Sequence, residues 1–302
     1  MSLDLDISAP LIEPLRCDLL DRHNICFNIL RLDTIHPTIH GNKWYKLKRN
    51  LRQFQTKGVS RVLSFGGAYS NHLYALAAAG EHFSLETIGL VRGEIVEPLN
   101  PVLKFAKDRG MTLIPLSRTE YRHKHEESFL AKLQDRLGPF QLLPEGGSNL
   151  LAVQGCEEIA ESIRWQSSSR PRIVALCCGT GATMAGIVAG LSHQSSSNPA
   201  EVLGISVLKG EGYLQGEVRK WLEKNHCQSA TNWRVEENYH CGGYAKTNPG
   251  LKAFLESFST SFSLPLEPVY TGKLIYALFN MIKEGVIPDG VEIIAIHTGG
   301  IY

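Results

Sequence analysis

One lysine in the sequence lies where its amine could act as a nucleophile. Lys43 follows Gly41 and Asn42 at the beginning of a helical pattern, so its amine would lie near the positive end of a helix. That location favours the neutral amine, which Schiff-base chemistry with a carbonyl compound requires. Without further context a lysine is more often a solvated surface residue, and Lys46 and Lys48 on the same helix are interpreted as exposed.

A glycine-rich segment in the second half of the chain could bind a phosphate group. Residues 178–183 follow an apolar run typical of a strand and open a helical pattern. Their backbone N–H groups and the hydroxyls of Thr180 and Thr183 could surround a phosphate at the helix N-terminus. The segment lacks the Lys-Ser/Thr ending of a nucleotide P-loop, and its spacing after Gly181 does not fit Gly-x-Gly-x-x-Gly. A nicotinamide oxidoreductase is therefore disfavoured, whereas a purely structural glycine turn stays open.

Two further glycine-rich segments, residues 64–72 and 297–300, lie where predicted strands end. In open α/β sheets the ends of the strands are where ligands collect. Ser70 and Asn71, taken alone, would more often cap the helix that follows them, because Ser and Asn favour N-cap positions. Such a cap also aims its side chain at the crevice by the strand ends, so the two roles are compatible. Thr298, taken alone, is typical of a turn.

The elements that must position these segments alternate between strand and helix along most of the chain. Short apolar runs separated by helical patterns predict an α/β fold with parallel sheets. The predicted strands are residues 61–65, 87–91, 112–116, 141–143, 173–177, 202–207 and 291–296, and the predicted helices are 45–57, 72–81, 102–109, 120–137, 151–165, 184–192, 216–225, 249–258 and 273–284.

Composition favours a small-molecule partner over nucleic acid or a membrane. Lys+Arg 31 against Asp+Glu 30 gives a net charge of +1, which produces no broad field for an anionic polymer or surface. The uncharged stretch 173–191 is long enough to span a bilayer, but its central glycines favour a strand, a turn and a helix. Seven cysteines without a Cys-x-x-Cys pair, and an N-terminal region without a signal pattern, predict a reducing, cytoplasmic location.

No metal site is expected. His36 and His40 have the spacing of one helix face, but Pro37 between them opposes a helix. No cysteine or carboxylate completes a ligand set around these histidines, which we interpret as ordinary surface residues.

Taken together, the segments resemble one known family. Residues 40–47, 64–72, 178–186 and 297–300, in this order and with Glu267-Pro-Val-Tyr-Thr-Gly-Lys, closely resemble the 1-aminocyclopropane-1-carboxylate deaminases and D-cysteine desulfhydrases, which are fold-type II pyridoxal-phosphate enzymes. The resemblance implies a tryptophan-synthase-β-like α/β architecture with two parallel-sheet domains and a cleft between them. It assigns residues 1–50 and 156–302 to a large cofactor-binding domain and residues 51–155 to a small domain, and it implies a homodimer.

The resemblance also implies the site. Lys43 would carry pyridoxal 5'-phosphate as a Schiff base, Asn71 would hold the ring hydroxyl, and Tyr270 would stack on the pyridine ring. The implied residues are Lys43, Ser70, Tyr244 and Tyr270 as catalytic residues, Lys43, Asn71, Gly179, Thr180, Gly181, Ala182, Thr183, Tyr270 and Thr298 as cofactor-binding residues, and Ser70, Asn71 and His72 as substrate-binding residues.

Two threonines bear on the choice of reaction. Family members that open the cyclopropane ring resemble one another in having Glu after the stacking Tyr and Leu in the terminal His-x-Gly-Gly, whereas this sequence has Thr271 and Thr298, as the desulfhydrases do. A hydroxyl facing the pyridine nitrogen leaves that nitrogen largely neutral and the electron sink weaker. Elimination of a good leaving group is the less demanding reaction.

We therefore expect a pyridoxal-phosphate-dependent lyase that converts a small D-amino acid such as D-cysteine to pyruvate, ammonia and a thiol. Two alternatives stay open. One is deamination of 1-aminocyclopropane-1-carboxylate to 2-oxobutanoate and ammonia. The other is a non-catalytic α/β protein that binds pyridoxal phosphate or another phosphate.

Overall fold

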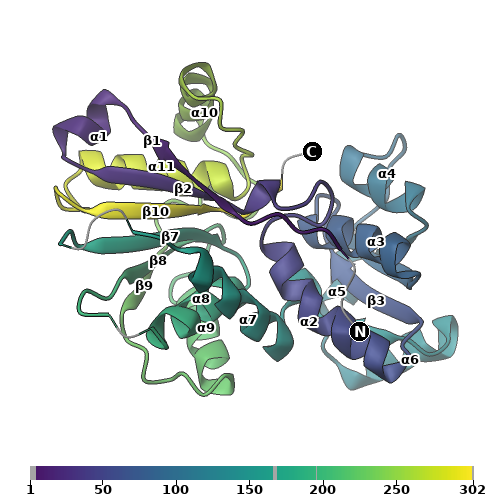
Figure 1. Ribbon diagram of the computed structural model, residues 1–302. Helices are drawn as coiled ribbons and strands as arrows, with labels where there is room; N and C mark the ends of the chain where they lie inside the picture. The colour runs from purple at the N-terminus through teal and green to yellow at the C-terminus, as the bar shows by residue number, and fades with distance from the viewer. Residues whose placement is uncertain (1–4, 166–168, 195, 301–302) are drawn as a thin grey trace.

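Two sheets built mainly from parallel strands frame the computed structural model, which describes residues 5–165, 169–194 and 196–300 (Figure 1). The larger sheet has the strand order β1-β2-β10-β7-β8-β9. Its first pair, β1 and β2, is antiparallel, and its other pairs are parallel. The strands are β1 (Leu11–Leu15), β2 (Cys26–Arg31), β10 (Glu292–His297), β7 (Arg172–Cys178), β8 (Glu201–Ser206) and β9 (Trp233–Glu236).

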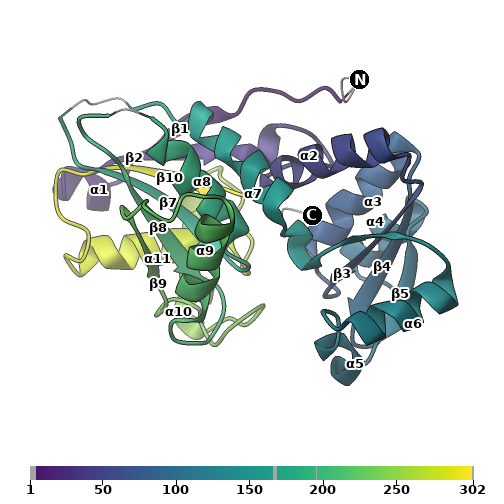
Figure 2. The same ribbon diagram turned by 90° about the horizontal axis from the view of Figure 1, so that it is seen from below.

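The smaller sheet has four parallel strands in the order β5-β4-β3-β6. They are β5 (Thr112–Leu116), β4 (Glu86–Arg92), β3 (Arg61–Gly66) and β6 (Gln141–Leu143). Figures 1 and 2 place α2 (Asn42–Lys57) and α7 (Leu150–Glu157), which pack against each other, between the two sheets. The division of the chain into two domains at residues 50 and 155 stays a proposal, because these two helices join the sheets.

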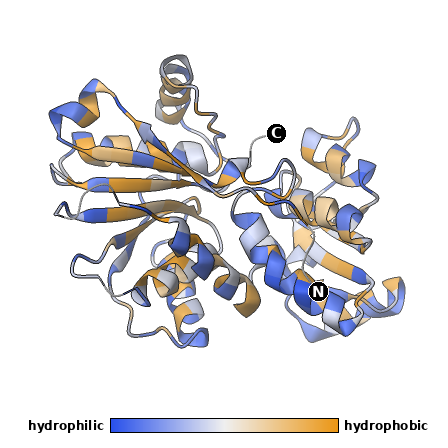
Figure 3. Cartoon of the chain, viewed as in Figure 1, coloured by the Kyte–Doolittle hydropathy of each residue, from blue (hydrophilic) through white to orange (hydrophobic). Residues whose placement is uncertain are grey.

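Both sheets are covered by helices on both faces, as parallel sheets require. In β10, Ile294 and Ile296 pack in the core that contains α8, while Ile293 and Ala295 pack in the core that contains α11. Figure 3 shows hydrophobic residues following the strands of the larger sheet. The remaining helices are α1 (Asp18–Arg22), α3 (Asn71–Phe83), α4 (Pro101–Asp108), α5 (Arg118–Arg122), α6 (Glu127–Leu137), α8 (Ala182–Ser192), α9 (Tyr213–Lys224), α10 (Pro249–Ser261) and α11 (Thr271–Lys283).

The predicted fold class is confirmed, and each of the seven predicted strands lies within one residue of an observed strand at either end. The sequence analysis missed β1, β2, β9 and α1. The first and last of these strands are sheet edges with few fully buried side chains, and β1 contains Pro14. In β2 the buried Asn28 interrupts the apolar run.

Two predicted helices are wrong in extent. The single helix expected over 120–137 is the pair α5 and α6, because the chain turns where Tyr121 and Lys124 both reach Glu145. The helix expected over 151–165 ends at Glu157, where a 3-10 helix (Glu158–Ser162) packs on α8 before the chain becomes extended. None of the described helices is long and apolar enough to cross a membrane.

Replacing Gly155 by Ala should lower the free energy of unfolding by about 1–3 kcal/mol. A Cβ at Gly155 would lie 2.0 Å from the Tyr45 carbonyl oxygen, where α7 meets α2, so the helices must move apart. The matched control is Gly216→Ala in α9, where a Cβ meets no atom within 4 Å and helix propensity favours alanine. Urea unfolding followed by circular dichroism measures both variants. Equal stabilities for the two would contradict a tight crossing at Gly155.

Candidate active site

A cavity of about 250 Å³ lies where strands of both sheets end. The strands β3 and β4 of the smaller sheet and β7 and β10 of the larger one have their carboxyl ends beside it. This edge of an α/β sheet is where ligands bind. Among the predicted site residues, Ala182 is buried at the start of α8 and does not line the cavity. The predicted residues that line it are Lys43, Ser70, Asn71, His72, Gly179, Thr180, Gly181, Thr183, Tyr244, Tyr270 and Thr298.

Lys43 is the second residue of α2, and its amine reaches the cavity. The helix begins after Gly41, whose φ of 69° and close approach to Thr298 exclude a larger residue: a Cβ at Gly41 would lie 2.0 Å from the Thr298 carbonyl oxygen. The Lys43 amine donates to the Asn42 side-chain oxygen at 2.7 Å. Burial, and next the charge of Lys46, lower the pKa of Lys43 to about 7. A large fraction of this amine is therefore neutral near physiological pH.

The glycine-rich loop between β7 and α8 forms one wall of the cavity. Gly181 adopts a φ of 76° immediately before the first turn of α8, so the free N–H groups of that turn stand at the end of the loop. The Thr183 hydroxyl accepts a hydrogen bond from the Asn42 side chain at 2.9 Å. This bond joins the loop to the beginning of the helix that carries Lys43.

The prediction that Lys46 and Lys48 are exposed is wrong. Only 3% of Lys46 is exposed, and its ammonium donates to the Gly146 carbonyl at 3.0 Å, the Ser148 hydroxyl at 3.0 Å and the Thr180 hydroxyl at 3.3 Å. Lys48 is also buried and forms an ion pair with Glu158. Because α2 lies between the two sheets, side chains on several of its faces are buried. Lys46 lies one helical turn from Lys43 and faces the glycine-rich loop.

Three consecutive residues at the start of α3 line the opposite wall. Ser70 caps this helix by accepting the N–H of Leu73 at 3.2 Å. The Ser64 hydroxyl donates to the Leu143 carbonyl, so it accepts from His72 Nε2 at 2.8 Å. His72 therefore carries its hydrogen on Nε2 and is neutral, since burial holds the pKa of His72 well below its ordinary value.

Within His72, the ring N–H is bonded to Ser64, so only the backbone N–H can donate to a carboxylate at the start of α3. Asn71 is the first residue of the same helix and lines the cavity beside it.

Two tyrosines meet edge to face over the glycine-rich loop. The ring centroids of Tyr244 and Tyr270 are 6.0 Å apart with an interplanar angle of 70°. Burial raises the pKa of both hydroxyls, so both phenols stay protonated. A Cβ on Gly179 would lie 3.6 Å from the Tyr270 ring, which shows how closely the ring and the loop approach.

Charged residues of α11 and the segment before it hold these tyrosines in place. The carboxylate of Glu267 accepts the backbone N–H groups of Val269, Tyr270 and Thr271 at 2.6, 2.8 and 2.7 Å. The fully buried ammonium of Lys273 donates to the carbonyls of His240 and Gly243, both at 2.8 Å. The second set of bonds ties the loop that carries Tyr244 to α11.

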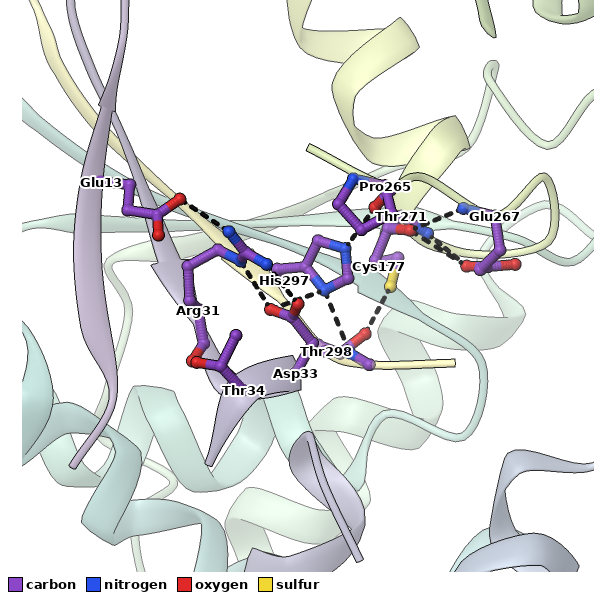
Figure 4. A network of polar contacts seen from close by, with 11 residues as sticks. Glu13, Arg31, Asp33, Thr34, Cys177, Pro265, Glu267, Thr271, His297 and Thr298 are labelled. Atoms are coloured by element: carbon purple, nitrogen blue, oxygen red, sulfur yellow. Dashed lines mark hydrogen bonds and ion pairs between the residues drawn. The ribbon is translucent and has the colours of Figure 1, made fainter. Parts of the chain in front are cut away.

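Thr298 lines the cavity at the carboxyl end of β10 and is held by the polar network in Figure 4. Its hydroxyl lies 3.3 Å from the Cys177 sulfur, and burial raises the pKa of that thiol to about 12, so the thiol keeps its proton. The preceding His297 lies between the Asp33 carboxylate at 3.1 Å and the Pro265 carbonyl at 2.8 Å. Asp33 in turn forms an ion pair with Arg31 at 2.7 Å.

The donor set of this cavity fits pyridoxal phosphate. The N-terminus of α8, the hydroxyls of Thr180 and Thr183 and the ammonium of Lys46 together offer positive charge and hydrogen-bond donors to a phosphate. The half-buried Lys43 amine lies in the same cavity as the Tyr270 ring and the Thr298 hydroxyl. These residues would hold the phosphate, the aldehyde carbon and the ring.

Several residues that line the cavity were missed from the sequence. Asn42 stands beside Lys43 in the Gly-Asn-Lys segment, and the i, i+3 spacing of Lys43 and Lys46 is a signal that both face one side of α2. Other lining residues had no sequence signal because they come from separate elements. Among them are Arg92, Glu145, Cys177 and Tyr213. His40, interpreted as a surface residue, is half-buried, and burial lowers its pKa to about 4.

Comparison with known proteins gives a family and a fold. A family model described as pyridoxal-phosphate dependent enzyme matches residues 20–299. The bifunctional D-cysteine desulfhydrase/1-aminocyclopropane-1-carboxylate deaminase, mitochondrial, of Arabidopsis thaliana is 30% identical over 292 residues, covering 90% of this chain and 72% of that protein. A putative 1-aminocyclopropane-1-carboxylate deaminase of Thermotoga maritima is 28% identical, covering 100% and 97%. The crystal structure of an ACC deaminase homologue has a TM-score of 0.83 at 24% identity, covering 99% and 91%.

Replacing Lys46 by Met should weaken the binding of pyridoxal phosphate by about ten- to a hundredfold, because the change removes a charged donor beside Thr180. Equilibrium dialysis of the apo-protein against the cofactor measures the dissociation constant. Lys57→Met, at an exposed position in the last turn of the same helix, is the control and should leave that constant unchanged. An unchanged constant for the Lys46 variant would remove Lys46 from the phosphate site.

Acylation of Lys43 in the apo-protein should rise with pH through a midpoint near 7. Only the neutral amine reacts, and the lowered pKa makes this amine neutral above about pH 7, whereas an ordinary lysine requires about pH 10. Brief treatment with acetic anhydride at a series of pH values, followed by mass spectrometry of peptides, measures the midpoint. A midpoint above about 9 would show that the cavity does not lower this pKa.

Proposed function

Because this chain belongs to the family of pyridoxal-phosphate-dependent enzymes, we propose that it is a lyase acting by β-elimination on a small D-amino acid, with D-cysteine as the model substrate. The overall reaction converts D-cysteine and water to pyruvate, ammonia and hydrogen sulfide. Names carried by the relatives support this class of reaction, since the Arabidopsis relative is named as both a D-cysteine desulfhydrase and a 1-aminocyclopropane-1-carboxylate deaminase.

Lys43 is proposed as the residue that binds the cofactor and then moves the proton. When bound, pyridoxal phosphate supplies an electron sink that stabilises negative charge on the Cα of an amino acid. With a pKa near 7, the Lys43 amine accepts the Cα proton at neutral pH without a further base. The Cβ–S bond then breaks, and its electron pair leaves with the sulfur.

The start of α3 is proposed to bind the substrate carboxylate. The free N–H groups of its first turn and the positive end of the helix favour an anion, and Asn71 and His72 supply two of these N–H groups. The Ser70 hydroxyl accepts the Leu73 N–H and keeps its own proton to donate toward the cavity. A substrate carboxylate bound in this way would orient one face of the substrate Cα toward Lys43.

The contact between Thr298 and Cys177 is the observation that carries the choice of reaction. A neutral hydroxyl next to a thiol that keeps its proton stands where β10 ends at the cavity. We propose that this hydroxyl faces the pyridine nitrogen, which then stays unprotonated. Unlike Thr298, Thr271 does not line the cavity. Its hydroxyl donates to Glu267 at 3.2 Å. Thr298 alone is therefore proposed to tune the electron sink.

Ring opening of 1-aminocyclopropane-1-carboxylate is the second candidate. The two protonated phenols of Tyr244 and Tyr270 favour it, because a protonated hydroxyl near the substrate could donate a proton to a carbon that leaves the ring. Several relatives bear the corresponding name.

A homodimer and a cytoplasmic location complete the proposal. The homodimer comes from the family resemblance. The location comes from the pattern of the seven cysteines, which all lie in the described residues and form no disulfide, in agreement with a reducing compartment.

Purified protein loaded with pyridoxal phosphate should release sulfide and pyruvate in equal amounts from D-cysteine. Replacing Lys43 by Ala should lower this rate by at least about a hundredfold, because the other amine on the described cavity lining, Lys46, is engaged with Gly146, Ser148 and Thr180. Lys104→Ala is the matched control, because Lys104 forms an exposed ion pair with Asp108 and does not line the cavity. Sulfide is measured colorimetrically, and pyruvate by coupled reduction to lactate.

Other outcomes would select among the alternatives. Release of 2-oxobutanoate from 1-aminocyclopropane-1-carboxylate, without sulfide from D-cysteine, would reverse the ranking of the two reactions. A protein that binds the cofactor but converts neither substrate, nor the L-enantiomer of cysteine, would contradict the lyase proposal.

A further inference from the structure

The smaller sheet contributes charged residues to the cavity that the proposed reaction does not use. Arg92 is the last residue of β4, and Glu145 follows β6, and both line the cavity. The neighbouring strands β3 and β4 are paired so that Gly66 lies opposite Val91, which places Arg92 beside the glycine segment that leads to Ser70. Both charges therefore stand on the wall that receives the substrate.

The negative charge of Glu145 already has partners within the protein. The Tyr121 hydroxyl donates to one carboxylate oxygen of Glu145 at 2.7 Å, and the Lys124 ammonium lies 3.5 Å from the other. Burial and the Glu145 charge raise the pKa of Tyr121, so its hydroxyl remains a donor. Glu145 thus has a hydrogen-bond donor and a counter-ion supplied by the protein itself.

Arg92 is exposed at the mouth of the cavity and has no counter-ion among the residues that the structure describes. Its guanidinium lies 5.8 Å from the centroid of the Tyr121 ring, and within residues 5–165, 169–194 and 196–300 it forms no ion pair. A guanidinium is always protonated and offers a planar fork of donors suited to a carboxylate. A contact with an aromatic ring leaves the positive charge of Arg92 in place.

Among the described residues that line the cavity, the two other basic side chains already have proposed roles. Lys46 donates to Thr180 in the proposed phosphate site, and Lys43 is the proposed nucleophile, with a pKa near 7. The α-carboxylate of an amino acid is proposed to lie at the start of α3. Arg92 is the remaining basic side chain of the described lining, and it has no role in the reaction proposed above.

We propose that Arg92 selects substrates whose side chain ends in an anionic group. The inference rests on the proposed β-elimination and deepens it by naming the substrate class: D-amino acids in which the group leaving from Cβ carries a carboxylate. For S-carboxymethyl-D-cysteine the Cβ–S bond breaks, the sulfur leaves with the electron pair and takes up a proton, and addition of one water yields pyruvate, ammonia and mercaptoacetate.

The test compares two substrates of nearly equal size with the holoenzyme. S-carboxymethyl-D-cysteine carries a negative charge at the end of its side chain, and S-carbamoylmethyl-D-cysteine is its neutral amide. The kcat/KM for the acid should exceed that for the amide by at least about tenfold, the value of one charge-assisted hydrogen bond. In Arg92→Met this ratio should fall to near one.

Arg109→Met is the matched control. The guanidinium of Arg109 also rests on an aromatic ring, 3.5 Å from the centroid of Phe105, but it does not line the cavity. Its ratio of acid to amide should equal that of the unaltered protein. A ratio near one in the unaltered protein would overturn the proposal. An equal loss for both substrates in Arg92→Met would also overturn it, because Arg92 would then bind the carboxylate that the two share.

Binding separates this inference from the proposed reaction. D-glutamate and D-glutamine have no leaving group at Cβ, so calorimetric titration of the holoenzyme with each compares the acid and the amide without elimination. Tighter binding of D-glutamate that disappears in Arg92→Met supports the proposal even if no substrate is turned over. Equal affinities for the two in the unaltered protein would reject it even if D-cysteine releases sulfide.

Discussion

The turn after β10 is pressed against the first residues of α2, and the position of the reactive lysine depends on this contact. The Asn42 N–H donates to the Thr298 carbonyl at 3.3 Å, at the point where Gly41 leaves no space for a side chain. On the other side, the turn is fixed by His297, whose ring lies between the Asp33 carboxylate and the Pro265 carbonyl. Buried ionic groups add little net stability, so we interpret this network as a device that fixes geometry.

Two lysines that line the cavity and one in α11 show how partners decide what a buried amine can do. Burial lowers the pKa of Lys43, Lys46 and Lys273 alike. Lys46 and Lys273 are surrounded by oxygen acceptors, which favour the charged form and fix the side chain. Lys43 has one amide oxygen as its partner and remains partly accessible. The same side chain therefore serves as a fixed charge in two places and as a reactive amine in the third.

The sequence was most informative where a single segment determines a position. Strand and helix periodicity located β3–β8 and β10, and the glycine-rich segments located the cavity walls, because each signal is local. The burial of Lys46 was missed, since it depends on Gly146, Ser148 and Thr180, which come from distant parts of the chain. Arg92 and Glu145 were missed for the same reason: only the pairing of β4, β3 and β6 brings them together.

The separation of the cavity walls between two sheets has a consequence for how such a protein diversifies. Thr298, Tyr270 and the glycine-rich loop belong to the six-stranded side, whereas Arg92 and Glu145 belong to the four-stranded side. With the roles proposed above, a substitution at Arg92 would change which substrate side chain is preferred and would leave the residues proposed to bind the cofactor unaltered. The cavity could thereby acquire a new substrate preference through changes on the four-stranded side alone.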